Sequence, residues 1–294
     1  MKNRLGNFFR SELFHNFLRN PGAVIGLVIV IFFLVMVLIG PFFTPQNPYD
    51  IGGLDLMDAY KPPMWMDGGE RAFPLGTDEQ GRDLLSAMVY GSRISMGIGL
   101  IVVLLSCVIG TFLGLVAGYF GGRLDSLLMR LVDVQLSFPA MLVALFIMAA
   151  FGRGFGKLVF ALTIVGWVLY ARTVRSSVLV EKKKEYIDAA KLIGLSPFPV
   201  IFRHVLPNIL TPLIVIATIQ VGTVILTEAT LSYLGVGVPV TKPSLGLLVK
   251  NGYDVLFSGL WWSSVFPGMF IMLLVFGINL LGDFLRDEFN PRLK

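Results

Sequence analysis

The stretch of this sequence that comes nearest to a phosphate-binding loop is Gly152-Arg153-Gly154-Phe155-Gly156-Lys157. A Walker-type loop needs G-x-x-x-x-G-K followed by Ser or Thr, because backbone amides cradle the phosphates and the hydroxyl ligates Mg²⁺. Here the first glycine is misplaced and Leu158 follows the lysine, so we expect a turn. The two histidines, His15 and His204, are too few and too far apart for a metal site. The sequence therefore assigns no catalytic residue and no metal ligand.

Three acidic residues, Asp133, Glu228 and Asp283, lie inside or at the end of apolar stretches, where a charge costs several kcal/mol unless it is paired or hydrated. Asp133 lies one helical turn after Arg130, which predicts an i,i+3 pair near the membrane surface. Glu228 has no charged residue nearby in the sequence. It would either face a translocation pathway and contact an amine, or accept interhelical hydrogen bonds from Ser or Thr.

A first polar segment, residues 42–93, is rich in Pro, Gly and Asp. Thr77 or Asp78 is expected to cap a helix that has Gly81 near its start. Asp78, Arg82 and Asp83 are expected to pair among themselves and fix this loop. Direct docking of another protein on the loop is the alternative.

The most charged part of the chain is a second polar segment, residues 172–205. The run from Glu181 to Ile193 has high helix propensity, and Gly194 is expected to end that helix at its C′ position. Ser196-Pro197 then opens a second short helix. The small pair Ala189-Ala190 would let another protein approach this helix–glycine–helix elbow closely. A solvated linker is the alternative.

The elements that must position these residues are membrane-spanning helices. The chain has 294 residues, of which 55% are hydrophobic and 15% charged, against about 25% charged in soluble domains, and its mean hydropathy is +0.77. The fold class is therefore all-α integral membrane. Six apolar runs are long enough to cross the hydrocarbon core, which takes about 20 residues. They are Gly22–Ile39, Ile94–Tyr119, Leu127–Phe151, Leu158–Ser177, Leu206–Leu234 and Trp261–Leu281.

The distribution of positive charge predicts the orientation. Segments on one side carry sixteen of the 24 lysines and arginines, so both termini are expected in the cytoplasm. The net charge of +5 does not indicate nucleic-acid binding, because the basic residues form no continuous stripe.

Residues 1–21, basic with an aromatic face, are expected to lie on the cytoplasmic membrane surface, or else to be a frayed tail. We then expect a first transmembrane helix over 22–41, an extracytoplasmic loop over 42–93, a five-helix core over 94–284 with its cytoplasmic loop at 178–205, and a cytoplasmic tail over 285–294.

The elbow resembles the "EAA" loop in the membrane subunits of ABC importers. Asp188-Ala189-Ala190, Gly194 and His204-Val205-Leu206-Pro207 stand at the family's spacing. Asp188 replaces the consensus Glu and keeps its charge on a shorter stem, and His204 replaces a consensus Ile. The resemblance implies a coupling helix that docks on an ATPase subunit, formed by Glu185, Asp188, Ala189, Ala190, Gly194, Leu206 and Pro207.

Further motifs, collinear over nearly the whole chain, resemble the second membrane subunit of dipeptide and oligopeptide permeases. They include Leu75-Gly76-Thr77-Asp78, Gly81-Arg82-Asp83, Tyr90-Gly91-Ser92-Arg93, Glu228-Ala229-Thr230-Leu231-Ser232 and Asn279-Leu280-Leu281-Gly282-Asp283. This resemblance implies a type I ABC importer transmembrane domain with six helices in a bacterial inner membrane. It implies as partners a homologous second permease subunit, two ATP-binding subunits and an extracytoplasmic peptide-binding protein. ATP and Mg²⁺ would bind to the ATPase subunits, and no cofactor to this chain.

The cargo stays open at this point. Relatives with the same machinery carry nickel, glutathione or antimicrobial peptides. A self-sufficient secondary transporter would need several buried ionisable groups or an inverted repeat, whereas only Glu228 lies deep and no internal repeat is evident. A membrane scaffold without cargo is the third alternative, for which the elbow would be incidental.

Overall fold

The structure is a computed structural model that describes residues 12–242 and 244–289. Within these residues the chain is helical, and its one β-type contact is an isolated bridge between Thr77 and Asp83. A π-helix, η4 (Val200–Val205), joins α9 to α10, and 3₁₀ turns cover Gly40–Phe42, Ile51–Gly53, Leu56–Asp58 and Leu256–Ser258. The α-helices are α2 (Glu12–Arg19), α3 (Pro21–Ile39), α4 (Leu84–Phe120), α5 (Gly122–Leu136), α6 (Ala140–Phe151), α7 (Phe155–Glu181), α8 (Glu185–Leu192), α9 (Pro197–Pro199), α10 (Leu206–Tyr233), α11 (Leu245–Asp254) and α12 (Trp262–Glu288).

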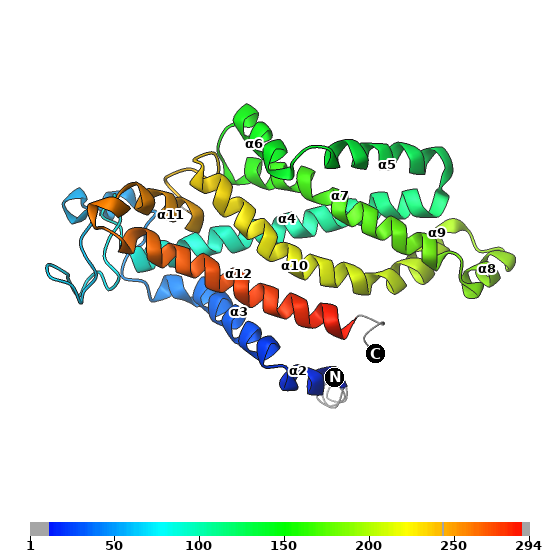
Figure 1. Ribbon diagram of the computed structural model, residues 1–294, viewed down its shortest axis with the longest axis horizontal. Coiled ribbons are helices and arrows are strands. Elements are labelled where there is room, and N and C mark those ends of the chain that lie inside the picture. The colour runs from blue at the N-terminus through cyan, green and yellow to red at the C-terminus, as the bar shows by residue number, and fades with distance from the viewer. Residues whose placement is uncertain (1–11, 243, 290–294) are drawn as a thin grey trace.

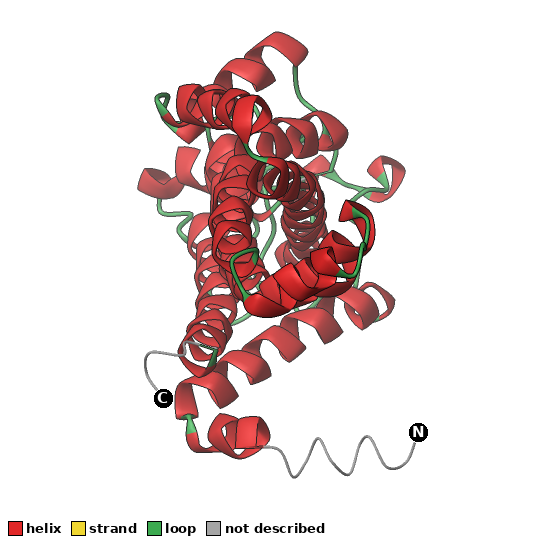
Figure 2. Cartoon of the chain, turned by 90° about the vertical axis from the view of Figure 1, so that its right-hand side faces the viewer, coloured by secondary structure: helices red, strands yellow, loops and turns green. Residues whose placement is uncertain are grey.

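The long helices pack along the longest axis of the molecule (Figure 1). α3 and α10 run toward the end that carries α11 and residues 42–83, whereas α4, α7 and α12 run toward the end that carries α8. Figure 2 views the bundle from the α8 end. The two polar segments of the sequence therefore lie at opposite ends of the bundle, as successive crossings of a membrane require.

Among the described residues, five helical segments are long and apolar enough to span a bilayer: Pro21–Phe42, Leu84–Phe120, Phe155–Glu181, Pro197–Tyr233 and Trp262–Glu288. The expectation of one continuous helix over Leu127–Phe151 is wrong. α5 and α6 meet at an angle of 86°, because Pro139 has no amide hydrogen and disfavours helical backbone at Phe138. The all-helical membrane fold is confirmed, with six spans if the bent pair counts as one.

The start of α4 also differs from the expectation. The helix begins at Leu84 rather than Ile94, and its N-cap is Asp83, whose carboxylate accepts the backbone N–H of Ser86 at 2.8 Å. Neither Thr77 nor Asp78 caps it. The polar signature therefore ends in a helix that continues into the membrane without a break.

Two segments of the C-terminal half were not expected in their observed form. α9, η4 and α10 follow one another directly and form a 37-residue span, Pro197–Tyr233, so the second arm of the elbow, α9 with η4, continues into α10 without a break. α11 occupies the stretch after α10 for which no helix was expected. Its two glycines, Gly246 and Gly252, lower helix propensity, but a Cβ on either would come within 2.4 Å of neighbouring backbone, so close packing explains them.

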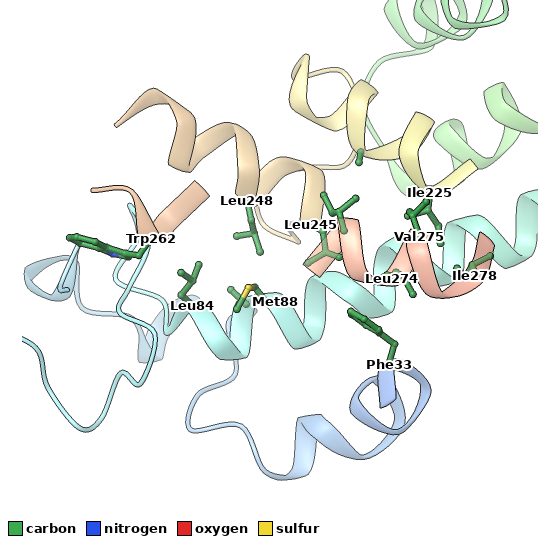
Figure 3. Packing of buried hydrophobic residues seen from close by; sticks show 13 residues of the cluster. Phe33, Leu84, Met88, Ile225, Leu245, Leu248, Trp262, Leu274, Val275 and Ile278 are labelled. Carbon is green, nitrogen blue, oxygen red and sulfur yellow. The ribbon is translucent and has the colours of Figure 1, made fainter. Parts of the chain in front are cut away.

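The main apolar core joins α3, α4, α10, α11 and α12 near the α11 end (Figure 3). Leu84, Met88 and Leu274 are fully buried in it. At the other end, α2 contacts the end of α12, where the rings of Phe17 and Phe284 lie 5.3 Å apart, edge to face. Of the segments expected at the cytoplasmic surface, residues 1–11 and 290–294 lie outside the described residues.

Candidate functional site

The elbow between α7 and α10 is built on a buried base. Ile187 is fully buried and Ala190 is 6% exposed, and both pack into a cluster with Val174 and Val178 of α7 and Val205 of η4. In the sequence, Ala189 and Ala190 are equivalent as small residues. The structure separates them, since Ala190 faces the chain's own core and Ala189 faces solvent.

The opposite face of the elbow is exposed and apolar. Leu192 is 87% exposed and Ile193 is 77% exposed, although both are large hydrophobic residues at the tip of the molecule. Phe198 and Phe202 continue this face at the start of the next helix. We call these four residues the apolar tip. An exposed apolar patch that is rimmed by polar residues is typical of a protein-interaction surface, and the rim here contains Glu185 and Asp188, both exposed.

Gly194 forms the sharp turn between the two arms. Its φ is +83°, a conformation in which a side chain would be strained. The N–H of Leu195 bonds the carbonyl of Ala190 at 3.2 Å, which is the long-range bond of a Schellman C-cap. The expectation that Gly194 would end the helix through its backbone freedom therefore matches this geometry.

A polar brace ties α8 to both neighbouring helices. The Tyr186 hydroxyl donates to the Glu181 carboxylate at the end of α7 and accepts Nδ2 of Asn208 in α10 at 3.0 Å. Burial and the bond to Glu181 raise the pKa of Tyr186 to about 12, so the phenol keeps the proton that it donates. Lys184 adds an ion pair to Glu181 at 2.7 Å. Leu206 and Pro207 lie in the first turn of α10, immediately before Asn208.

The base of the elbow is continuous with a tight contact between α4 and α7 that the sequence reading missed. Gly110, Gly114 and Gly118 form a stripe on α4 at four-residue spacing. A Cβ at Gly114 would lie 2.6 Å from the carbonyl oxygen of Ala171, and one at Gly110 would lie 2.4 Å from that of Trp167. The two backbones touch, as in membrane helix pairs with small residues at the interface. The i,i+4 spacing of glycines in the apolar run was the available signal.

Asp133 does not pair with the nearby Arg130 as expected. Its carboxylate is 2.5 Å from a guanidinium nitrogen of Arg172 on α7, and the pair is exposed at the α8 half of the bundle. A second such pair joins Asp125 of α5 to Arg175 of α7. Asp133 therefore has an interhelical bond, and the two ion pairs hold α5 against α7.

Glu228 is fully buried in α10. Its carboxylate accepts the hydroxyl of Ser95 in α4 and the hydroxyl of Ser232 in α10, each at 2.7 Å. Of the two roles left open by the sequence, the contacts match the interhelical one, because a side chain with no exposed surface lines no pathway in this conformation.

We therefore expect the replacement of Glu228 to act on the stability of the fold rather than directly on transport. We expect Glu228→Ala to lower the free energy of unfolding by about 2 kcal/mol, because two buried hydroxyls lose their acceptor. Glu228→Gln keeps an acceptor and should cost less. Thermal unfolding of the purified chain measures both. A pathway role would instead reduce uptake in both variants while the unfolding temperature stayed unchanged.

The signature of the 42–93 segment forms a buried polar cluster beside α11. Arg82 and Asp78 are almost fully buried, with Nε and Oδ2 at 2.6 Å, and Arg82 also donates to the carbonyl of Val240 at 3.4 Å. The Thr77 hydroxyl accepts the N–H of Lys61 at 2.7 Å. Gly81 has φ +73° and lies against the carbonyl of Asp55. These contacts match the structural role preferred over direct docking, although Asp83 caps α4 instead of joining the pair.

No cluster of three or more His, Cys, Asp or Glu that could hold a metal occurs among the described residues. The turn expected over Gly152–Lys157 covers only Gly152–Gly154, with Gly152 at φ +79°, and Phe155–Lys157 already form the start of α7. The backbone N–H of Gly154 in this turn bonds the carbonyl of Gly237 at 3.2 Å, which ties it to the segment after α10.

Comparison with known proteins places these features in a family. Residues 110–294 match a family model described as "Binding-protein-dependent transport system inner membrane component", and residues 9–63 match the "N-terminal TM domain of oligopeptide transport permease C". The chain is 36% identical to the dipeptide transport system permease protein DppC of Haemophilus influenzae, over 97% of this chain and 95% of that one. It is 39% identical to the di/tripeptide transport system permease protein DppC of Pseudomonas aeruginosa, over 97% and 92%. It is 41% identical to DppC of Escherichia coli, over 97% and 93%.

The fold is similar to that of a solved transporter chain. An inward-facing structure of the MetNI methionine ABC transporter matches with a TM-score of 0.57 at 21% identity, covering 69% of this chain and 97% of that chain. At that identity the likeness concerns the fold alone. It shows the arrangement of helices of an ABC importer membrane domain.

Proposed function

This chain belongs to the family of binding-protein-dependent transport system inner membrane components, and from that premise we propose that it is the second permease subunit of an ABC importer for dipeptides and short oligopeptides. It is a multi-pass protein of the inner membrane, and it carries transport rather than catalysis. The collinear match to dipeptide permeases over nearly the whole chain supports the peptide cargo.

The observation that supports the coupling role is the apolar tip on its buried base. ATP-binding partners are implied by the family, and we propose two of them, which would hold ATP and Mg²⁺ and grip the elbow from the cytoplasm. Leu192 and Ile193 present apolar area outward, while Ile187 and the Tyr186 brace hold α8 against α7 and α10. Because α8 is held against α7 and α10 in this way, we expect a displacement of α8 to move both of these helices with it.

We propose that a homologous second permease forms the other half of the pathway and that a peptide-binding protein delivers cargo at the 42–83 end. Both termini would then be cytoplasmic, in agreement with the distribution of Lys and Arg. ATP binding would favour one of two global states and hydrolysis the other, so access to the pathway would alternate between the two sides.

The proposal can be tested by measuring the import of a labelled dipeptide in cells that lack this chain and in the same cells after the chain is restored. Restoring the chain should restore import of a labelled dipeptide and leave import of nickel unchanged. The ATP-binding subunits should co-purify with the chain. Restoration of nickel uptake alone would replace the peptide with a metal cargo, and transport by the single purified chain in vesicles would overturn the ABC mechanism.

A further inference from the structure

Arg93 stands where two cavities meet. The first, which we call the tail groove, has a volume of about 550 Å³ and lies between α3, α4, α10 and α12. Its walls are apolar apart from Arg93 and Thr218, and the Thr218 hydroxyl is bonded to the carbonyl of Ile214 at 2.9 Å. Residues such as Leu34, Leu100 and Val221 form these walls. One cation thus lies at one end of an otherwise apolar groove.

The second cavity, which we call the head chamber, has a volume of about 400 Å³ and shares Arg93 and Gly97 with the first. It adds a second cation, Lys242, and the phenols of Tyr49 and Tyr90. Burial raises the pKa of Tyr49 to about 12, so its phenol stays neutral. No acidic side chain lines either cavity within the described chain. The Tyr49 hydroxyl donates to the carbonyl of Tyr90 at 3.3 Å, so the groups that the head chamber offers to an anion are the cations of Arg93 and Lys242 and the phenol of Tyr90.

The length of the tail groove matches one leaflet of a bilayer. Along α4 it runs from Arg93 to Val103, which at 1.5 Å per residue is about 15 Å. That is half of a hydrocarbon core about 30 Å thick. Arg93 lies in the third turn of α4, in the half of the helix nearer residues 42–83, from where a long cationic side chain can extend toward the headgroup level.

The size of the tail groove argues against a protein occupant. At 5.4 Å per turn, the groove length of about 15 Å along α4 holds fewer than three turns of an α-helix, whereas a membrane-spanning helix needs about 20 residues. An acyl chain of one leaflet needs only that length. The groove is also open at Gly97, where a Cβ would meet no atom within 4 Å.

We propose that the tail groove and the head chamber together bind one anionic phospholipid. Its phosphate lies at Arg93 and Lys242, and one acyl chain follows α4 toward Val103. The lipid belongs to the leaflet on the side of residues 42–83. Because it contacts α3, α4, α10 and α12 together, it joins the N-terminal helix to the core helices that lead to the elbow.

The full chain, purified in detergent with its partner subunits, provides the test. We expect phosphatidylglycerol to remain bound in native mass spectrometry and to raise the unfolding temperature more than phosphatidylcholine does. Arg93→Gln should lower the affinity for phosphatidylglycerol about tenfold or more, because it removes a charge-assisted bond, and Arg93→Lys should keep much of it. Gly97→Phe should reduce binding by filling the groove while leaving both cations in place.

Matched controls separate a site from general attraction to the membrane. Arg153→Gln removes an exposed arginine at the same end of the bundle, and Gly268→Phe enlarges a glycine whose Cβ also meets no atom within 4 Å; neither should change lipid binding. The proposal fails if Gly97→Phe binds phosphatidylglycerol like the wild type, or if Arg153→Gln loses as much as Arg93→Gln. It also fails if inorganic phosphate alone gives the full rise in unfolding temperature.

Discussion

Replacing both Leu192 and Ile193 with aspartate is expected to release the ATP-binding subunits while the chain remains folded in the membrane. The two side chains are 87% and 77% exposed, so the change creates no cavity and buries no charge in the free chain. In the complex, each apolar anchor that becomes a carboxylate should cost about 2 kcal/mol or more of binding free energy. Pull-down of the ATPase subunits and ATP-dependent peptide uptake should both fall to background.

The control for this variant is Leu18→Asp, which places the same charge on an exposed leucine of α2 away from the elbow. It should leave co-purification and uptake intact. Ala190→Arg is a poorer test, because Ala190 packs into the base and the variant would unfold the elbow itself. Normal coupling of hydrolysis to uptake in the double aspartate variant would show that the apolar tip is not the docking surface.

Gly114→Leu should prevent the chain from reaching its folded state in the membrane. A Cβ at this position already lies 2.6 Å from the carbonyl oxygen of Ala171 and 2.7 Å from Cβ of Val174, and both contacts belong to the main body of α7. The helices would have to separate along their whole contact, which should cost about 3 kcal/mol or more. Yield of monodisperse protein and its unfolding temperature measure the effect.

Gly97→Leu on the same helix is the matched control. It makes the same change of residue in the same apolar run, but its Cβ meets no atom within 4 Å. In detergent without added phosphatidylglycerol, the replacement of this helical glycine should leave stability unchanged or raise it by up to about 1 kcal/mol. If both leucine variants fold equally well, the α4–α7 contact is not as close as the structure has it.

The spans and the elbow could be predicted because both depend on local signals. A long apolar run indicates a membrane-spanning segment by itself. Gly194 and Ser196-Pro197 likewise indicate a turn without reference to any other part of the chain. The bend at Pro139 was missed because a count of apolar residues continues through it. The helix α11 was missed because its glycines serve packing against Ala229 and Ser263, which lie elsewhere in the chain.

The roles of individual side chains could not be predicted, because each depends on a contact with a residue that is distant in the sequence. Asp133 meets Arg172, 39 residues later, instead of its neighbour Arg130. Glu228 meets Ser95, 133 residues earlier, so it is buried between helices. Ala189 and Ala190 are adjacent in sequence, yet Ala189 is exposed and Ala190 packs into the base of the elbow, which only the position of α8 on α7 decides.

The backbone contact between α4 and α7 has a mechanical consequence. The glycines of α4 have no side chains that could repack, and they lie directly on the α7 backbone and on Val174 and Val178. We therefore expect the pair to move as one rigid unit that connects the 42–83 end to the start of the elbow. A switch between two access states must then bend somewhere else. Among the described residues, the sharp break within a candidate span is at Ser137-Phe138-Pro139, where α5 and α6 meet at 86°, so this is where we expect such bending.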